Sequence, residues 1–231
     1  MELEEIIGRL EAGSDPKAVA GMARFGIVGA KVYGLRIPVL RALAKEIGRD
    51  HELAGRLWAA GARETRILAA MIDDPALVTA ARMEDWVADL DSWEVCDQLC
   101  QCLFQDTALA EAKALEWTER EEEFVKRAGF VLLARLAVSR KKEPDATFER
   151  YLPVIVREAW DGRNFVRKAV SWALRQIGKR NPALNRRAVE TAEEIMAQGT
   201  GPARWLAKDV LRELRSDKLR RRLEAKAAPP T

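Results

Sequence analysis

Apolar residues recur three or four positions apart along almost the whole chain, the spacing of residues that share one face of an α-helix. The run from Leu40 through Leu43 to Ile47 is one example. Alternating strand-like runs bounded by Asn-Gly or Asp-Gly turns do not occur in the sequence. The pattern therefore predicts an all-helical protein.

Capping residues divide this pattern into short helices. Asp15 precedes Pro16 and Asp50 precedes an apolar run, as N-cap residues do. Thr118 stands three residues before Glu121, the spacing of a capping box, which predicts one long helix from there to Ser139. We expect one domain over residues 1–226 and a disordered tail over 227–231.

The chain contains an internal repeat. Phe-Val-Lys-Arg-Ala at Phe124–Ala128 returns as Phe-Val-Arg-Lys-Ala at Phe165–Ala169, 41 positions later. A weaker echo relates Leu174–Ile177 to Leu211–Leu214. A period near 40 residues with paired helices is typical of HEAT and armadillo repeats. We predict an all-α, α-α superhelix of HEAT/armadillo-like repeats with a concave basic face, and the alternative is an irregular helical bundle.

Composition and charge narrow the class of protein. The 231 residues are 48% hydrophobic and 32% charged, which is typical of a soluble globular chain. No apolar run approaches the roughly 20 residues that span a bilayer, and the acidic start at Met1–Glu5 differs from a basic signal peptide. We therefore expect a cytoplasmic protein without a membrane partner.

The distribution of charge along the chain is more informative about binding partners than the net charge of +3. Between Arg163 and Arg187 there are eight basic side chains and no acidic one, with Trp172 among them. A block of one sign interleaved with aromatic residues favours binding to a polyanion over a plain solvated face. The residues of this block that we expect to bind DNA are Arg163, Arg167, Lys168, Arg175, Lys179 and Arg180.

A tryptophan and an aspartate one helical turn apart form the first candidate site. Trp93 lies on an apolar helical arc with Cys96 and Leu99, and Asp97 lies at the edge of that arc. A carboxylate bordering an apolar stripe is unusual, because an unpaired buried charge is costly. The alternative is a carboxylate that caps or pairs with a neighbouring helix.

Two further residues stand out on apolar helices. Arg127 has few open directions, so it could pair with a phosphate or with Asp97, or else extend along the surface. Trp172 falls off the apolar stripe of its helix, beside Lys168 and Arg175, which suits a nucleic-acid surface. Its alternative role is packing against the next repeat.

The sequence gives little support for a metal site, a cofactor site or catalysis by histidine. Cys96, Cys100 and Cys102 cluster in one helical stretch, but structural zinc needs four ligands and His51 is remote in sequence. Buried core cysteines are the favoured interpretation. There is no P-loop, dinucleotide-binding glycine motif or His-Glu-x-x-His, so we expect no cofactor and no metal.

With these motifs the sequence resembles the DNA alkylation repair family, the HEAT-like-repeat alkylpurine DNA glycosylases, from about Ala18 to Leu214. The motifs that carry the resemblance are Met22–Phe25, Gly34–Pro38, Ser92–Asp97, Phe124–Ala128 and Phe165–Arg175.

The resemblance implies roles for the unusual residues. Trp93 and Asp97 fall on the tryptophan and aspartate of the family's active site, and Arg127 and Trp172 fall on its arginine and second tryptophan. Phe25 stands where the family often has a DNA-contacting tyrosine, so a hydroxyl is lost there.

The implied function is a DNA glycosylase that hydrolyses the N-glycosidic bond of cationic purines such as 3-methyladenine and 7-methylguanine in double-stranded DNA. The partner is then alkylated duplex DNA, bound by a nucleoid-associated monomer. One alternative is a non-catalytic DNA-structure-binding protein on the same scaffold. Another is a HEAT-type protein-interaction scaffold.

Overall fold

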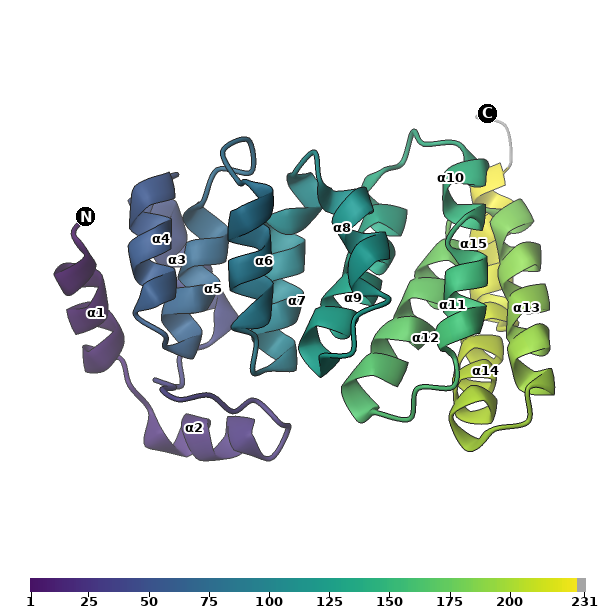
Figure 1. Ribbon diagram of the computed structural model, residues 1–231, viewed down its shortest axis with the longest axis horizontal. Helices are drawn as coiled ribbons and strands as arrows, with labels where there is room; N and C mark the ends of the chain where they lie inside the picture. Colours follow the sequence, from purple (N-terminus) through teal and green to yellow (C-terminus); the bar gives the residue numbers. More distant parts are fainter. Residues whose placement is uncertain (228–231) are drawn as a thin grey trace. The chain divides into compact units, whose positions relative to one another are not determined.

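The computed structural model describes residues 1–227, and the regular elements within that range are helices (Figure 1). The chain divides into two compact units, residues 1–110 and residues 111 onwards. The N-terminal unit contains α1 (Leu3–Ala12), α2 (Pro16–Ala23), α3 (Ile37–Ile47), α4 (His51–Ala59), α5 (Arg63–Ile72), α6 (Ala80–Ala88), α7 (Trp93–Cys102) and the 3-10 helix η1 (Phe104–Asp106). The C-terminal unit contains α8 (Ala110–Trp117), α9 (Glu123–Ser139), α10 (Asp145–Glu149), α11 (Leu152–Glu158), α12 (Asn164–Gly178), α13 (Pro182–Ala197), α14 (Gly201–Leu214) and α15 (Asp217–Ala227).

In the N-terminal unit α5 packs between α3 and α7, and α4 packs against α5. The core between them is formed by residues such as Leu40, Ile67 and Leu99, which are fully buried. The carboxylate of Glu64, also fully buried, accepts hydrogen bonds from the backbone N–H groups of residues 33, 34 and 35. This carboxylate therefore fixes the segment that leads from α2 into α3.

In the C-terminal unit α12 packs between α9 and α14, and α11 and α13 lie against α12. Helix α9 also approaches the end of α8 closely at Gly129. A Cβ at Gly129 would lie 2.8 Å from the carbonyl oxygen of Ala114 and 2.8 Å from the amide nitrogen of Thr118. The absence of a side chain at this position is what permits the approach.

The sequence repeat corresponds to a structural repeat within this unit. The motif at Phe124–Ala128 begins α9, and its copy at Phe165–Ala169 begins α12. The rings of Phe124 and Phe165 lie side by side with centroids 5.6 Å apart. Equivalent positions of successive repeats thus occupy neighbouring places, as expected of stacked helical repeats.

Most predicted helix ends are confirmed. Asp15 Oδ1 accepts from the N–H groups of Lys17 and Ala18, and Asp50 Oδ1 accepts from that of Leu53. The prediction that Thr118 opens the long helix is wrong. The Thr118 hydroxyl donates to the carbonyl oxygen of Leu115 and so belongs to the end of α8, whereas α9 begins at Glu123.

No helix within residues 1–227 is long and apolar enough to cross a membrane. Helix α15 extends to Ala227, and the remainder of the tail expected to be disordered, 228–231, lies outside the described residues. The single domain expected over residues 1–226 stays a prediction.

Candidate nucleic-acid interface

Trp93 and Asp97 occupy the first and second turns of α7. Trp93 is the first helical residue, after Ser92 in extended conformation, and both Trp93 and Asp97 are half-buried. The indole Nε1 of Trp93 donates to the backbone carbonyl of Phe25 at 2.9 Å. The structure therefore brings Trp93 against the backbone of Phe25, with Asp97 one turn further along α7, and Phe25 is 75% exposed.

A buried ion pair anchors this end of α7. Arg63, with 3% of its surface exposed, donates from Nε to Glu94 at 2.6 Å and from Nη1 to Glu64 at 2.7 Å. Burial lowers the pKa of Arg63, but the two carboxylates outweigh burial and raise it above its usual value. Because Glu94 follows Trp93 directly, this network fixes the backbone that carries the indole.

Arg127 lies near the start of α9 and is buried, with 6% exposed. Its Nη1 donates to the backbone carbonyl of Phe165 at 2.7 Å, at the start of α12. Burial excludes the alternative of an arginine extended along the surface. Arg127 joins equivalent ends of two successive repeat helices.

Trp172 is half-buried in the middle of α12. With the Gln176 amide oriented to offer its oxygen, that oxygen lies 2.7 Å from the indole Nε1 of Trp172. Lys168, one turn earlier on the same helix, is exposed. A cation, an aromatic ring and an amide lie along one line of α12, because Lys168, Trp172 and Gln176 are spaced four residues apart.

Four of the six expected DNA-binding cations are held by partners within the C-terminal unit. Arg163 pairs with buried Asp161 at 2.6 Å, and Arg175 and Lys179 both pair with Glu213, at 2.7 and 2.8 Å. Arg180 donates to the carbonyls that end α9 and lies 3.6 Å from the centre of the Phe148 ring. Burial lowers the pKa of Arg180.

The other two expected cations are presented differently. Arg167 stacks its guanidinium over Trp205 of α14, 4.6 Å from the ring centre, and Lys168 is exposed. Trp205 is not among the residues that the sequence pattern indicated. A usable signal existed, because Trp205 follows Arg167 by 38 positions, close to the repeat period, and stands directly after Arg204.

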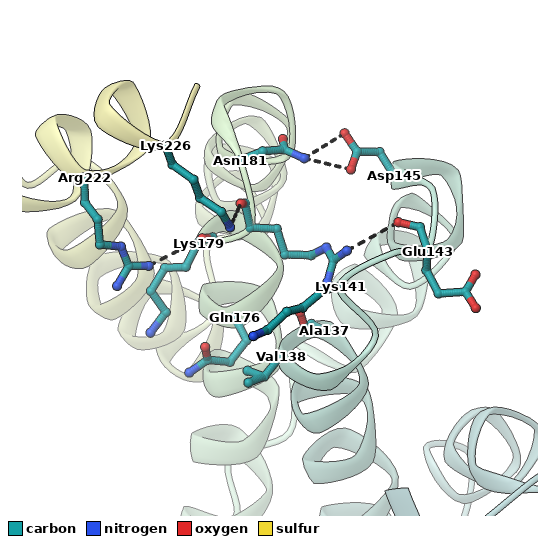
Figure 2. Close-up of a pocket in the computed structure, with 11 residues that line it drawn as sticks. Ala137, Val138, Lys141, Glu143, Asp145, Gln176, Lys179, Asn181, Arg222 and Lys226 are labelled. Atoms are coloured by element: carbon teal, nitrogen blue, oxygen red, sulfur yellow. Dashed lines mark hydrogen bonds between the residues drawn. The ribbon is translucent and has the colours of Figure 1, made fainter. Parts of the chain in front are cut away.

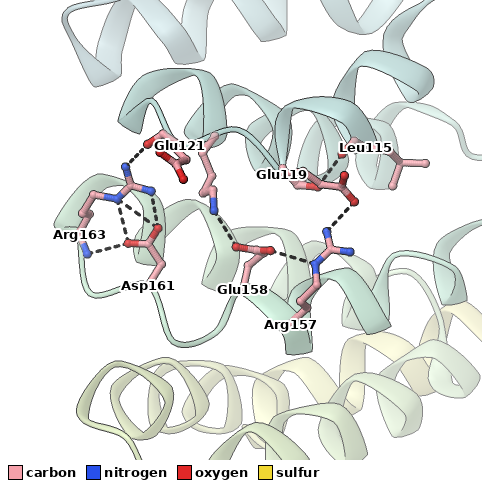
Figure 3. Close-up of polar contacts among 9 residues, drawn as sticks. Leu115, Glu119, Glu121, Arg157, Glu158, Asp161 and Arg163 are labelled. Atoms are coloured by element: carbon pink, nitrogen blue, oxygen red, sulfur yellow. Dashed lines mark hydrogen bonds and ion pairs between the residues drawn. The ribbon is translucent and has the colours of Figure 1, made fainter.

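A polar network holds the segments that precede α9 and α12 (Figure 3). Lys126 and Glu158 form a buried pair at 2.7 Å, and Arg157 bridges Glu158 and Glu119 at 2.9 and 3.1 Å. Arg163 extends the network by donating to the carbonyl oxygen of residue 121 at 2.5 Å. These contacts fix the starts of both repeat helices, where Arg127 is also held.

Cys96 and Cys100 are buried in α7, and Cys102 is half-buried. The burial of Cys96 and Cys100 agrees with the interpretation of them as core cysteines. Within residues 1–227, no group of three or more histidine, cysteine, aspartate or glutamate residues is arranged to hold a metal ion.

The fold is that of a HEAT-like helical-repeat protein, and the aromatic and basic side chains described above lie on helices of both units, among them α7, α9 and α12. Residues 6–214 match the family model described as DNA alkylation repair enzyme. The chain therefore belongs to the DNA alkylation repair enzyme family, which confirms the family resemblance and the predicted all-α repeat fold, while the concave basic face stays a prediction.

A solved structure supports the fold independently. It represents a new family of proteins related to the HEAT-like repeat DNA glycosylases, with affinity for branched DNA structures. The match has a TM-score of 0.75 and 19% identity, and it covers 84% of this chain and 83% of that chain. A comparison with curated proteins gives no match.

Proposed function

We propose that the protein is a DNA glycosylase that releases cationic alkylated purines, such as 3-methyladenine and 7-methylguanine, from double-stranded DNA. The observation that carries this proposal is the pair of Trp93 and Asp97 on consecutive turns of α7, in a member of the DNA alkylation repair enzyme family. We also propose that it acts as a monomer on nucleoid DNA in the cytoplasm.

The chemistry of the proposed substrate requires only a carboxylate and an aromatic ring for base release. A purine alkylated at a ring nitrogen is already positively charged and leaves easily, so no strong general acid is needed. Positive charge develops on the sugar in the oxocarbenium-like transition state. The Asp97 carboxylate would stabilise that charge and orient the attacking water. The face of the Trp93 ring would lie against the deoxyribose and attract its partial positive charge.

The C-terminal unit would contribute contacts to the DNA backbone. The exposed Lys168 and the half-buried Trp172 lie on one line of α12, where a phosphate and a deoxyribose can be contacted together. Arg167 stacked on Trp205 adds a pre-oriented guanidinium. Arg127, whose Nη1 is fixed at the start of α12, would hold a phosphate near the lesion or orient Asp97.

The test is the release of 7-methylguanine from a methylated duplex by Asp97→Asn. The substitution removes the charge and keeps the shape, so release should fall by about 100-fold or more while DNA affinity stays near that of the wild type. The matched control is Asp85→Asn, which removes an exposed carboxylate from α6 and should leave release unchanged. Release at the wild-type rate by Asp97→Asn would show that Asp97 is not catalytic.

A second function is favoured by the described affinity of the structural relative for branched DNA. A non-catalytic binder of branched DNA would use the same cations and aromatic rings without releasing a base. Equilibrium binding to a four-way junction and to a linear duplex of equal length distinguishes the two functions. A strong junction preference without base release from any methylated duplex would favour the binder. A protein-interaction scaffold, in contrast, would show no salt-dependent binding to either DNA.

A further inference from the structure

The C-terminal unit contains a cleft of about 630 Å³ beside the last turns of α9 and α12, where α15 passes them (Figure 2). Its lining carries two carboxylates, those of Glu143 and Asp145. The cations that line it are Lys141, Lys179, Arg180, Arg222 and Lys226.

Helix α15 supplies two of these cations and holds them against the end of α12. Lys226 Nζ donates to the carbonyl oxygen of Arg180 at 2.8 Å, and Arg222 Nη2 donates to that of Lys179 at 3.4 Å (Figure 2). Arg180 itself donates to the carbonyls of Ala137 and Arg140 at the end of α9. Four carbonyls at the two helix ends are thus already paired, those of Ala137, Arg140, Lys179 and Arg180.

The cleft stays positive after the carboxylates of its lining and the two helix ends are counted. The ends of α9 and α12 each contribute about half a negative charge, and the two carboxylates contribute one each. The carboxylate of Asp145 is further occupied by two hydrogen bonds from Asn181, at 2.8 and 3.0 Å. Against five cations this leaves an excess of about two positive charges. Lys179 also pairs with Glu213, but that carboxylate is shared with Arg175.

Two of the cations keep most of their hydrogen-bonding capacity. Lys141 and Arg222 are both exposed, and neither forms an ion pair with a carboxylate of the described residues. Arg222 uses one of its five N–H donors on the Lys179 carbonyl. Charged donors converging on an open cleft suit the oxygens of a phosphate group.

The cleft is continuous with the candidate DNA surface of the same unit. Gln176 lines the cleft, and its amide lies 2.7 Å from the indole of Trp172. Lys179 lies seven residues beyond Trp172 on α12, about 10 Å along the helix axis. That distance is roughly three nucleotide steps of a DNA strand. A strand that contacts Trp172 and runs along α12 would bring later phosphates to the cleft.

We propose that this cleft binds backbone phosphates of DNA, as a contact separate from Trp93 and Asp97. This inference rests on the proposed function in one respect, that DNA is the ligand of the protein. It adds Lys141, Arg222 and Lys226 to the DNA-binding residues, none of which the sequence indicated.

Two double variants test the cleft with matched loss of charge. Lys141→Gln with Arg222→Gln removes two lining cations. Lys142→Gln with Arg221→Gln removes their immediate neighbours, which are exposed and lie outside the cleft lining. Both variants keep Lys226 and Arg180, which cap helix ends. The cleft variant gives up the long 3.4 Å hydrogen bond from Arg222 to the Lys179 carbonyl, so it should unfold close to the wild-type temperature.

The measurement is duplex affinity across a series of salt concentrations. Each phosphate contact contributes about 0.9 to the slope of log affinity against log salt, so the cleft variant should lose about 1.8 from the slope. Between 50 and 200 mM salt the wild type should then lose about 12-fold more affinity than the cleft variant. The neighbour variant should keep the wild-type slope.

The salt slopes of the two double variants decide whether the cleft binds DNA phosphates. Equal slopes for the two double variants would overturn the cleft proposal, even if base release is intact. A reduced slope for the cleft variant alone supports it, even if no base is released and the glycosylase proposal fails. Titration with inorganic pyrophosphate separates the two sources of phosphate. If the cleft variant loses pyrophosphate binding and keeps the wild-type duplex slope, the assignment to DNA is overturned.

Discussion

Glu213 of α14 restrains two of the cations that we expect to bind DNA. Its carboxylate accepts from Arg175 Nη1 at 2.7 Å and from Lys179 Nζ at 2.8 Å. Burial raises the pKa of Glu213, but hydrogen bonds from these cations outweigh burial and hold it below its ordinary value. The carboxylate is therefore charged at neutral pH. Glu213→Gln keeps the shape of the side chain and removes the charge, which releases both cations for phosphate binding.

The size of the effect follows from the number of cations released. If Arg175 and Lys179 each gain a phosphate, the slope of log affinity against log salt should steepen by up to about 1.8. A fourfold rise in salt then costs the variant up to about 12-fold more affinity than it costs the wild type. At low salt, duplex affinity should exceed that of the wild type.

Fluorescence anisotropy with a labelled duplex across a salt series measures both quantities. The matched control is Glu190→Gln on α13, which removes an exposed carboxylate paired with Arg187 at 2.8 Å. The control should leave the slope unchanged, since Arg187 is not among the predicted DNA contacts. If Glu213→Gln leaves slope and affinity unchanged, Arg175 and Lys179 do not face DNA, and the basic block has a structural role at these positions.

Two further predictions concern stability. Gly129→Ala should lower the melting temperature by several degrees, because its Cβ would lie 2.8 Å from backbone atoms at the end of α8. Overpacking of this kind costs about 1–3 kcal/mol. The gain in helix propensity from glycine to alanine is at most about 1 kcal/mol, so the cost exceeds it. Gly8→Ala in α1, with no atom within 4 Å, should instead stabilise, and a rise for both variants would contradict the close approach. Burial raises the pKa of Asp161, but hydrogen bonds from Arg163 lower it below the ordinary 3.8. The contribution of Asp161 to stability is therefore complete above pH 3.8 and is lost as the pH falls through the lower folded pKa. In denaturation curves the difference between wild type and Asp161→Asn should shrink below pH 3.8, and a constant difference would refute the charge pairing.

Local sequence signals predicted the fold well because they act over a few residues. The carboxylates of Asp15 and Asp50 cap the helices that directly follow them, and the hydrogen bonds close within three positions. The prediction for Thr118 was wrong, because the same hydroxyl can serve a helix that ends or one that begins. Which helix it serves depends on where α8 stops against α9.

The candidate site likewise combines a feature that a local pattern predicts with a contact that only packing decides. Asp97 follows Trp93 by one helical turn, so their common face was readable from the sequence alone. The hydrogen bond from Trp93 to the Phe25 backbone joins residues 68 positions apart, and no local pattern indicates it.

The sequence by itself determined the helical class, the repeat period and the order of aromatic and charged residues along each helix, because these depend on spacing within one element. The tertiary structure decided which cations are neutralised and which are presented, because ion pairs form between helices. Glu213 meets Arg175 and Lys179 across α12 and α14, and Arg222 reaches the end of α12 from α15. The sequence gives the number of cations, whereas the number left unpaired at the surface depends on the carboxylates of the helices packed against them.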